Sequence, residues 1–476
     1  MPMLEEQPDA PEEACGVFGI YAPEEPTAKL TYFGLYALQH RGQESGGITT
    51  FDRQGKSHTY KAMGLVSQIF NETILKELPG EIAVGHNRYS TTGSSKVCNA
   101  QPIVVPTNLG DLALAHNGNL VNALELRAEL VAQGISLSST SDSEAIAWAV
   151  AEGVNQKGNW IEGTIGAIKR CQGAFSLAIG TAQGIMAIRD SYGVRPLVIG
   201  SLGNGKWVIA SETCALDIIG AELVREVRPG ELVWIDGNGL QSHQWQEPTP
   251  KLCIFELIYF SRPDSINQAE SLYAYRMRLG NILATESPVE ADIVIGIPDS
   301  GIPAAIGYAQ TSGIPFGEGL IKNRYVGRTF IQPTQAMRET GIKMKLNPLK
   351  DILQGKRVIV VDDSIVRGTT SRKIVQVLRE AGATQVHMRI SSPPVTHPCF
   401  YGIDTDCQSQ LIAAQQSQAE IARTIGVDSL AYLSEGGMLQ ATQTNPHQFC
   451  TACFNGKYPI EISDKLKRTK LILETP

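Results

Sequence analysis

The sequence predicts two globular domains in series: an α+β domain built on packed antiparallel sheets, followed by an α/β domain built on a parallel sheet. A chain of 476 residues is too long for a single hydrophobic core, and its 42% hydrophobic residues are enough for two. Over residues 15 to about 240, short apolar or alternating runs are separated by Gly, Asn and Asp turns, which is typical of β-rich structure. Beyond about residue 252, apolar strands alternate with helical stretches, which indicates βαβ units.

The elements of the first domain follow from hydrophobic periodicity. Strands are expected at 83–84, 113–115, 176–179 and 207–209, and helices near 31–38, 122–131 and 143–151. The polar segment 236–251 carries Gly and Pro and predicts a boundary, so that the two domains span 15–240 and 252–476. Residues 1–14 are acidic and rich in proline, with little to bury, and read as an appendage.

In the second domain, two apolar strands each precede a helical stretch. The strands are 293–297 and 358–361, the helices are 303–311 and 369–382, and a further strand is expected at 386–390. Ligands of such folds bind at the carboxyl ends of the parallel strands, so we expect the site of this domain there.

Composition narrows the classes of function. The net charge of −7 argues against a nucleic-acid partner. No window reaches the roughly 18 apolar residues that a membrane helix needs, and the first residues lack the apolar region of a secretory signal. We therefore expect a cytoplasmic protein. Nine cysteines spread over both halves indicate metal ligands or nucleophiles rather than a disulfide scaffold.

Cys15 is the candidate nucleophile of the first domain, because three polar clusters follow it at strand edges. Hydrolysis of glutamine needs a thiolate, an oxyanion hole and groups that hold the substrate's α-carboxylate and α-ammonium. Asn117 and the backbone N–H of Gly118 suit the oxyanion hole. Arg88 suits the carboxylate and Asp142 the ammonium.

The general base is not an obvious side chain. An α-amino group titrates near pH 7.7–8.0, which is suitable for this role. If residues 1–14 are a propeptide that is removed, Cys15 becomes the first residue, and its own amine can activate its own thiol.

Five motifs in the first domain carry a family resemblance: CGVFGI, LQHRGQESGGI, HNRYSTTG, HNGN and SDSE. In this order they resemble the class II glutamine amidotransferases, which belong to the N-terminal-nucleophile hydrolases. The resemblance covers residues 15–240 and implies a four-layer αββα fold. It also implies that Arg41, in the HRGQE motif, lies near the bound glutamine; the alternative is a surface charge.

The segment RVIVVDDSIVRGTTSRK, residues 357–373, carries the second chemistry. Adjacent carboxylates end a buried strand, and a polar loop leads into a helix whose N-terminal N–H groups suit a phosphate. Adjacent carboxylates also suit the two hydroxyls of a ribose and a Mg²⁺ ion. The segment resembles the binding loop of type I phosphoribosyltransferases, which implies binding of phosphoribosyl pyrophosphate. The residues concerned are Asp362, Asp363, Ser364, Arg367, Gly368, Thr369 and Thr370.

Two further segments match the same family. GIPDSG, residues 296–301, resembles the pyrophosphate loop, which implies Mg²⁺ at Ser300, Asp362 and Asp363. The segment 322–350 is rich in Lys and Arg, which is usual for a solvated basic face; beside a phosphate site we expect a mobile lid instead. The lid residues implied by the resemblance are Lys322, Tyr325, Arg328 and Lys343.

Four cysteines of the second domain form a candidate metal site. Cys450 and Cys453 are a CxxC pair, and Cys253 and Cys399 match the positions of a cluster-bearing branch of the family. Four thiolates suit zinc or a 4Fe–4S cluster, and the resemblance implies the cluster. Cys407 is the remaining thiol of this region and is expected to be a buried, structural one.

Together the two resemblances imply that ammonia released from glutamine displaces pyrophosphate from phosphoribosyl pyrophosphate. The product is 5-phosphoribosylamine, and the reaction is the first step of purine synthesis. The resemblance also implies a homotetramer inhibited by purine nucleotides. The rivals are another class II amidotransferase, such as a sugar isomerase or an asparagine-forming synthetase, and a regulatory protein that only senses its ligand.

Overall fold

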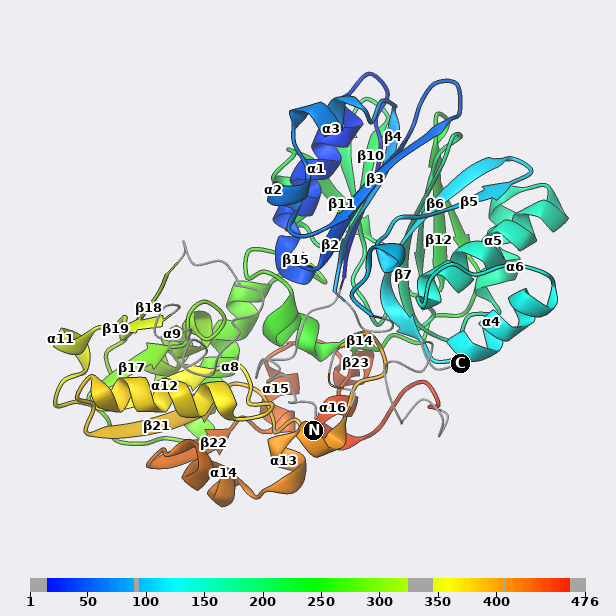
Figure 1. Ribbon diagram of the computed structural model, residues 1–476. Helices are drawn as coiled ribbons and strands as arrows, with labels where there is room; N and C mark the ends of the chain where they lie inside the picture. Colours follow the sequence, from blue (N-terminus) through cyan, green and yellow to red (C-terminus); the bar gives the residue numbers. More distant parts are fainter. Residues whose placement is uncertain (1–14, 90–93, 324–345, 404, 406, 463–476) are drawn as a thin grey trace.

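The computed structural model describes residues 15–89, 94–323, 346–403, 405 and 407–462. Two bodies meet along a joint near the middle of the molecule (Figure 1). The predicted propeptide, residues 1–14, lies outside the described residues. No described helix is long and apolar enough to cross a membrane.

The first body has two antiparallel sheets packed face to face. The seven-stranded sheet has the order β11-β9-β10-β1-β4-β2-β3 and the six-stranded sheet has the order β13-β12-β8-β7-β6-β5. Small and branched side chains such as Val17, Val84, Ala115 and Ala178 fill the space between the sheets. The strands are β1 Gly16–Tyr21, β2 Ser45–Phe51, β3 Ser57–Met63, β4 Ile82–Arg88, β5 Ile103–Thr107, β6 Gly110–Leu120, β7 Gly173–Thr181, β8 Ile185–Arg189, β9 Val198–Gly203, β10 Lys206–Ala210, β11 Glu222–Glu226, β12 Glu231–Asp236 and β13 Gly239–Gln244.

Helices cover the outer face of each sheet (Figure 1). On the seven-stranded sheet lie α1 Thr27–Ala37, α2 Val66–Ile69 and α3 Glu72–Lys76, and on the six-stranded sheet lie α4 Ala123–Ala132, α5 Asp142–Lys157 and α6 Trp160–Ile168. The four layers confirm the predicted αββα fold. β13 crosses residue 240, the predicted end of this domain, and pairs with β12 along its whole length. The boundary therefore stays a proposal, which this pairing moves to just after Gln244.

The second body is built on a parallel sheet of order β17-β20-β21-β22, which confirms the predicted α/β fold. Helices α8 and α9 pack on one face, and α12 and α14 pack on the other. The bounds are α8 Leu272–Glu286, β17 Ile293–Gly296, α9 Ile302–Ser312, β20 Arg357–Asp362, α12 Thr369–Glu380, β21 Gln385–Ile390, α14 Gln418–Ile425 and β22 Ser429–Tyr432.

Shorter elements connect these layers. They are η1 Gln39–Arg41, η2 Val97–Asn99, α7 Cys214–Asp217, β14 Leu252–Cys253, η3 Glu256–Phe260, β15 Ile266–Asn267, β16 Glu270–Ser271, β18 Leu320–Lys322, β19 Leu346–Pro348, α11 Lys350–Leu353, η4 Gln408–Gln410, α13 Ile412–Gln415, α15 Glu435–Gln440, η5 Pro446–Gln448, β23 Phe449–Cys450 and α16 Ala452–Asn455. Of these, η3 has π-helical geometry.

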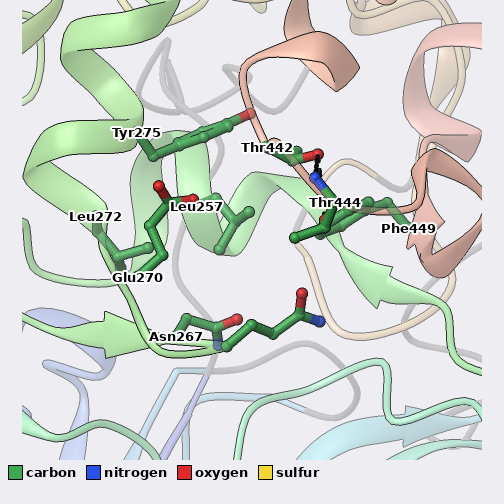
Figure 2. Close-up of a pocket in the computed structure, with 9 residues that line it drawn as sticks. Leu257, Asn267, Glu270, Leu272, Tyr275, Thr442, Thr444 and Phe449 are labelled. Carbon is green, nitrogen blue, oxygen red and sulfur yellow. Dashed lines mark hydrogen bonds between the residues drawn. The ribbon is translucent and has the colours of Figure 1, made fainter.

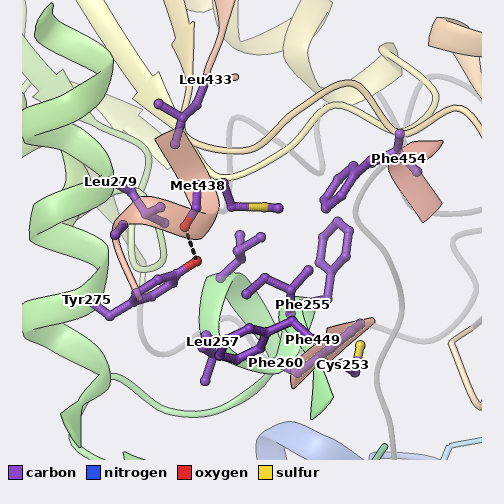
Figure 3. Packing of buried hydrophobic residues seen from close by; sticks show 14 of the residues in the cluster. Cys253, Phe255, Leu257, Phe260, Tyr275, Leu279, Leu433, Met438, Phe449 and Phe454 are labelled. Atoms are coloured by element: carbon purple, nitrogen blue, oxygen red, sulfur yellow. Dashed lines mark hydrogen bonds between the residues drawn. The ribbon is translucent and has the colours of Figure 1, made fainter. Parts of the chain in front are cut away.

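The joint between the bodies is apolar at its centre. Val121, Ala174 and Val194 of the first body belong to the same buried cluster as the cysteine-bearing segments of the second. Within that cluster, the rings of Phe255 and Phe454 stack with centroids 5.4 Å apart (Figure 3). The two halves therefore share one core rather than meeting through a linker alone.

Candidate functional site

The candidate nucleophile lies at an edge between two strands. Cys15 precedes β1, and the antiparallel pairing of Gly16 with Asn87 places it beside Arg88. The Cys15 Sγ donates to the carbonyl of Tyr89 at 3.3 Å. Burial raises the pKa of the thiol to about 12, although the positive charge of Arg88 opposes this shift. The thiol therefore needs a base to become a nucleophile.

The predicted oxyanion residues lie on β6. His86 of β4 bonds through its Nε2 to the carbonyl of His116 at 3.0 Å, which brings this part of β6 against the strand that ends at Arg88. The side-chain amide of Asn117 is buried, and neither of its polar atoms has a partner among the described residues. Gly118 has a φ of 149°, and an added Cβ would lie 2.0 Å from the Ala174 carbonyl oxygen, so only glycine fits.

Asp142 is fixed by the start of α5. Ser141 caps this helix, and the carboxylate lies at the positive end of the helix dipole. Its Oδ2 accepts the backbone N–H of Leu120 at 2.9 Å, and its Oδ1 lies 3.8 Å from His116 Nδ1. Asp142 and the residues of β6 are thus joined directly, as the predicted site requires.

Arg41 is fully buried, so the alternative of a surface charge is wrong. Its Nε donates to the carbonyl of Cys15 at 3.0 Å. Its terminal nitrogens donate to Glu212 at 2.6 Å and to both carboxylate oxygens of Glu256 at 2.9 and 3.0 Å. Arg41 therefore contacts the nucleophile's backbone, and a direct contact with glutamine stays a prediction.

In the second body, two loops meet at the carboxyl ends of neighbouring strands. The backbone N–H of Ile297, after β17, donates to the carbonyl of Val361 in β20 at 2.9 Å. An added Cβ on Gly301 would lie 2.5 Å from the same carbonyl, so the pyrophosphate loop runs close against β20. Ser300 hydrogen-bonds the carboxylate of Asp363, which brings the predicted magnesium ligands together.

The paired carboxylates differ in their surroundings. Asp363 is 5% exposed, and its burial raises the pKa of that carboxyl against the hydrogen bonds from Ser300 and Ser364 and the charge of Arg276. Ser364 donates to Asp363 at 2.7 Å. Asp362 is less buried and accepts the Asp363 N–H at 3.0 Å.

The loop after the paired carboxylates leads into α12 as predicted. Gly368 has a φ of 78° and turns the chain into the helix, and Thr369 and Thr370 form its first turn. Arg367 donates to the amide oxygen of Gln410 at 2.9 and 3.1 Å. The helix therefore begins after a short loop that follows the paired carboxylates, and the N–H groups of a helix N-terminus suit a phosphate.

Lys322 is the one predicted lid residue within the described part of the chain. Its Nζ donates to Asp299 of the pyrophosphate loop at 2.6 Å, with both side chains largely exposed. The predicted lid residues Tyr325, Arg328 and Lys343 lie outside the described residues.

The four candidate cysteines converge at the joint. Cys253 in β14 pairs with Cys450 in β23. The pKa of Cys453 lies well above its usual range because of burial and because the other three thiols are close. The backbone N–H of Tyr401 donates to Cys399 Sγ at 3.4 Å.

Cys407 stands apart from this group, and its Sγ lies 2.9 Å from Ser409 Oγ. It is only half-buried, so the expectation of a buried thiol is wrong. In the described part of the chain, no three His, Cys, Asp or Glu side chains are close enough together for a single ion.

Sequence reasoning missed the charges buried at the joint. Glu256 and Arg195 have completely buried side chains and form an ion pair at 2.9 Å. Glu212 joins the same group through Arg41. A pocket also lies beside η3, lined in part by Leu257, Asn267 and Phe449 (Figure 2), but none of its lining residues belongs to a predicted site.

Two family models match the chain, one in each body. A glutamine amidotransferase domain matches residues 86–217, and a phosphoribosyl transferase domain matches residues 267–391. An amidophosphoribosyltransferase of Synechocystis sp. is 66% identical over 99% of this chain and 96% of its own length. The chain belongs to the amidophosphoribosyltransferase family. An amidophosphoribosyltransferase of Mycobacterium tuberculosis is 50% identical over 99% of this chain and 91% of its own.

Solved structures of amidophosphoribosyltransferases agree with this assignment. One, described as the allosteric regulatory enzyme of purine biosynthesis, is 47% identical, has a TM-score of 0.89 and covers 95% of this chain and 97% of its own. The B. subtilis glutamine phosphoribosylpyrophosphate amidotransferase, solved with ADP and GMP, is 47% identical with a TM-score of 0.88 and covers 94% and 98%.

As an amidophosphoribosyltransferase, the chain is a glutamine-dependent pentosyltransferase. Glutamine, phosphoribosyl pyrophosphate and water give 5-phosphoribosylamine, glutamate and pyrophosphate, in the first step of purine biosynthesis. The predicted enzyme class and reaction are confirmed, and the family decides against a different class II amidotransferase.

Proposed function

We propose that this reaction begins at Cys15, whose thiolate attacks the side-chain carbonyl of glutamine, while Asn117 and the backbone N–H of Gly118 stabilise the resulting oxyanion. The buried amide of Asn117, which has no partner among the described residues, carries this proposal, because a buried polar group without a partner is costly unless a ligand satisfies it. Arg88 and Asp142 hold the α-carboxylate and α-ammonium, and Arg41 completes the site. Cys15→Ala tests the proposal: glutamine-dependent synthesis should vanish and ammonia-dependent synthesis should remain.

The base in this proposal is the α-amine of Cys15 after residues 1–14 are removed. The thiol donates its hydrogen bond to the Tyr89 carbonyl, and a backbone carbonyl is too weak a base to take the proton. Because the pKa of the thiol is raised, a separate base is needed to form the thiolate. N-terminal mass spectrometry of active enzyme should show Cys15 as the first residue. Active enzyme that retains the first 14 residues would rule out this base.

The second half of the reaction is assigned to the edge formed by β17 and β20. Asp362 and Asp363 hold the ribose hydroxyls, and the loop from Ser364 through Thr370, including Arg367 and Gly368, holds the 5-phosphate at the start of α12. With Ser300, the two carboxylates hold Mg²⁺, which when bound supplies positive charge to the leaving pyrophosphate. The residues around it orient the ribose for in-line attack by ammonia.

Lys322 supports the pyrophosphate side of this assignment, because its contact with Asp299 already places an ammonium at the loop. Tyr325, Arg328 and Lys343 are proposed to add contacts to pyrophosphate from the lid. Closure of the lid would exclude water, which otherwise captures the activated ribose.

The four converging thiols are proposed to hold a 4Fe–4S cluster. The residues fit the group: burial and the nearby thiols of Cys253, Cys450 and Cys399 raise the pKa of Cys453, and a backbone N–H points at Cys399 Sγ. Each thiolate of such a cluster binds its own iron, so the four need not approach as closely as the ligands of one zinc ion. The reaction moves no electrons, which makes the cluster structural or oxygen-sensing. Iron and sulfide analysis on anaerobically purified enzyme distinguishes it from zinc.

The wider setting is proposed on the family's chemistry. The enzyme is cytoplasmic, since nine unbridged cysteines and an iron–sulfur cluster suit a reducing compartment. Purine nucleotides inhibit it, as the B. subtilis relative solved with ADP and GMP suggests. A homotetramer and the domain limits 15–240 and 252–476 complete the proposal, with the first domain carried on to Gln244 by the pairing of β13 with β12. Sedimentation of the holoenzyme with and without GMP tests the assembly and nucleotide binding together.

A further inference from the structure

Glu256 is a buried carboxylate that the phosphoribosyl half contributes to the glutamine half. It lies in η3, three residues after Cys253, and its side chain is completely shielded from solvent. It accepts two hydrogen bonds from Arg41 at 2.9 and 3.0 Å and one each from Arg195 at 2.9 Å and Ser261 at 3.0 Å. A carboxylate offers about four lone-pair sites, and all are used here.

Such a group is expensive to bury. Two guanidinium groups and two carboxylates, from Arg41, Arg195, Glu212 and Glu256, lose their water together, and their mutual attraction only offsets this when every hydrogen bond is made. Apolar residues of similar volume would often serve stability as well. A fully satisfied ionic group at this place therefore calls for a reason other than stability.

The reason lies at the other end of Arg41. While two of its nitrogens hold Glu256, its Nε donates to the carbonyl of Cys15 at 3.0 Å. Once Cys15 is the first residue, no preceding peptide bond holds it in place. The hydrogen bond from Arg41 Nε to its carbonyl then fixes the orientation of the residue, and with it the directions of its amine and its thiol. Arg41 is a long side chain, and the fork of its guanidinium sets its direction only if both carboxylates are in place.

We propose that Glu256 is a positioning residue for glutamine hydrolysis: it orients Arg41, which in turn orients Cys15. The inference rests on the proposed role of Cys15 as the nucleophile. It assigns to the phosphoribosyl half a residue on which the first half-reaction depends, without contact between that residue and glutamine. Arg195 secures Glu256 from the opposite side and also donates to the carbonyl of Tyr401 at 2.9 and 3.0 Å.

The test is Glu256→Gln in the full-length holoenzyme, which keeps the shape and removes the charge. We expect kcat with glutamine to fall about 10- to 100-fold, because displacement of a reacting group by about 1 Å costs on the order of 100-fold. KM for glutamine should stay within about 3-fold, since Arg88 and Asp142 make no contact with Glu256 in the described structure. Synthesis from ammonia should keep its rate.

Two companion variants keep the test decisive. Ser261→Ala removes one hydrogen bond to the same carboxylate without touching a charge, and should lower kcat in the same direction by a few-fold. Glu231→Gln is the matched control: that carboxylate is also buried and pairs with Arg225 at 2.8 Å, but it lies on β12 and is not among the described hydrogen-bond partners of Arg41. It should leave both activities unchanged.

Two results would overturn the inference. If glutamine and ammonia activities fall together, Glu256 only supports the fold. If Glu256→Gln hydrolyses glutamine at the normal rate but no longer couples it to synthesis, Glu256 seals the joint instead of orienting Cys15. Cys15→Ala separates both of these outcomes from a failure of the proposed function. If that variant still hydrolyses glutamine, Cys15 is not the nucleophile, and the proposed function itself is wrong.

Discussion

Gly402 offers a direct test of how closely the second half of the chain supports the oxyanion strand. It follows the segment that contains Cys399 and has a φ of 100°. An added Cβ would lie 3.0 Å from the carbonyl oxygen, 3.1 Å from the carbonyl carbon and 3.2 Å from the Cα of Gly118. Gly402→Ala therefore presses on the residue whose N–H is proposed to bind the oxyanion.

The expected magnitude has two parts. A non-glycine residue held at such a φ costs about 1–3 kcal/mol, which lowers stability. Since the contacts are tighter than ordinary van der Waals contact, Gly118 must give way by a few tenths of an ångström. Complete loss of one oxyanion donor costs about 2.7–4 kcal/mol, or roughly 100- to 1,000-fold in rate, so a partial displacement should cost about 10-fold.

The assay compares synthesis from glutamine with synthesis from ammonia. Gly402→Ala should lower kcat with glutamine about 10-fold and leave the ammonia reaction unchanged. Gly426→Ala is the control: its φ is 81°, so its backbone cost is similar, but no atom of the described residues lies within 4 Å of the added Cβ. Both variants should lose a similar amount of thermal stability. Full glutamine activity in Gly402→Ala, or an equal loss in the control, would refute the reasoning.

Other substitutions separate the two sites and the buried network beneath them. Asp362→Asn combined with Asp363→Asn should abolish synthesis from either nitrogen source while basal glutamine hydrolysis, measured as glutamate release, remains. Gly118→Ala should abolish glutamine hydrolysis, because the added Cβ meets the Ala174 carbonyl at 2.0 Å; retained glutamate release would show that β6 relaxes freely. His86 is buried, and burial lowers its pKa to about 3, so the folded state resists protonation that the unfolded state accepts below about pH 6.5. The contribution of His86 to the free energy of unfolding should therefore be fully present above pH 6.5 and fall by about 2 kcal/mol by pH 5. His86→Gln should remove this part of the pH dependence, measured as the shift in thermal midpoint between pH 7 and pH 5.

The residues with motif signatures could be predicted because their placement is local. Asp362 ends a strand and Thr369 begins a helix, so the βαβ rule alone puts them at one edge of the sheet. Asp142 likewise begins α5 directly after its capping serine. In each case a few neighbouring residues determine both the element and the direction of the side chain.

The buried charges at the joint could not be found in this way. Arg41 lies 171 residues before Glu212 and 215 before Glu256, and no local pattern gives contacts over such distances. One signal was available: Glu256 is the lone charge in the apolar run CIFELIYF, and a charge in such a run must be buried with a partner. The identity of that partner depends on how the two domains meet.

The domain boundary near residue 240 was hard to predict for a different reason, namely that a polar edge strand resembles a linker in sequence. β13 is an edge strand with mostly exposed or half-buried side chains, so its sequence is as polar as a linker. Its place in the sheet comes from backbone pairing with β12, which leaves little trace in hydrophobic periodicity.

These long-range contacts have a consequence for how the two activities are divided. Asn119 donates to the carbonyl of Phe400 at 3.0 Å, Gly118 packs on Gly402, and Arg41 reaches Glu256, so three separate contacts tie the glutamine site to the second half. Each of the two C-terminal segments involved carries a candidate cluster cysteine, Cys253 or Cys399. If the cluster organises those segments, its loss should disturb the oxyanion strand and Cys15 before it disturbs the ribose edge, since Asp363 is held by Ser300 and Ser364 from its own domain. Ammonia-dependent synthesis should then outlast glutamine-dependent synthesis when oxygen destroys the cluster, and the reverse order would mean that the two halves are supported independently.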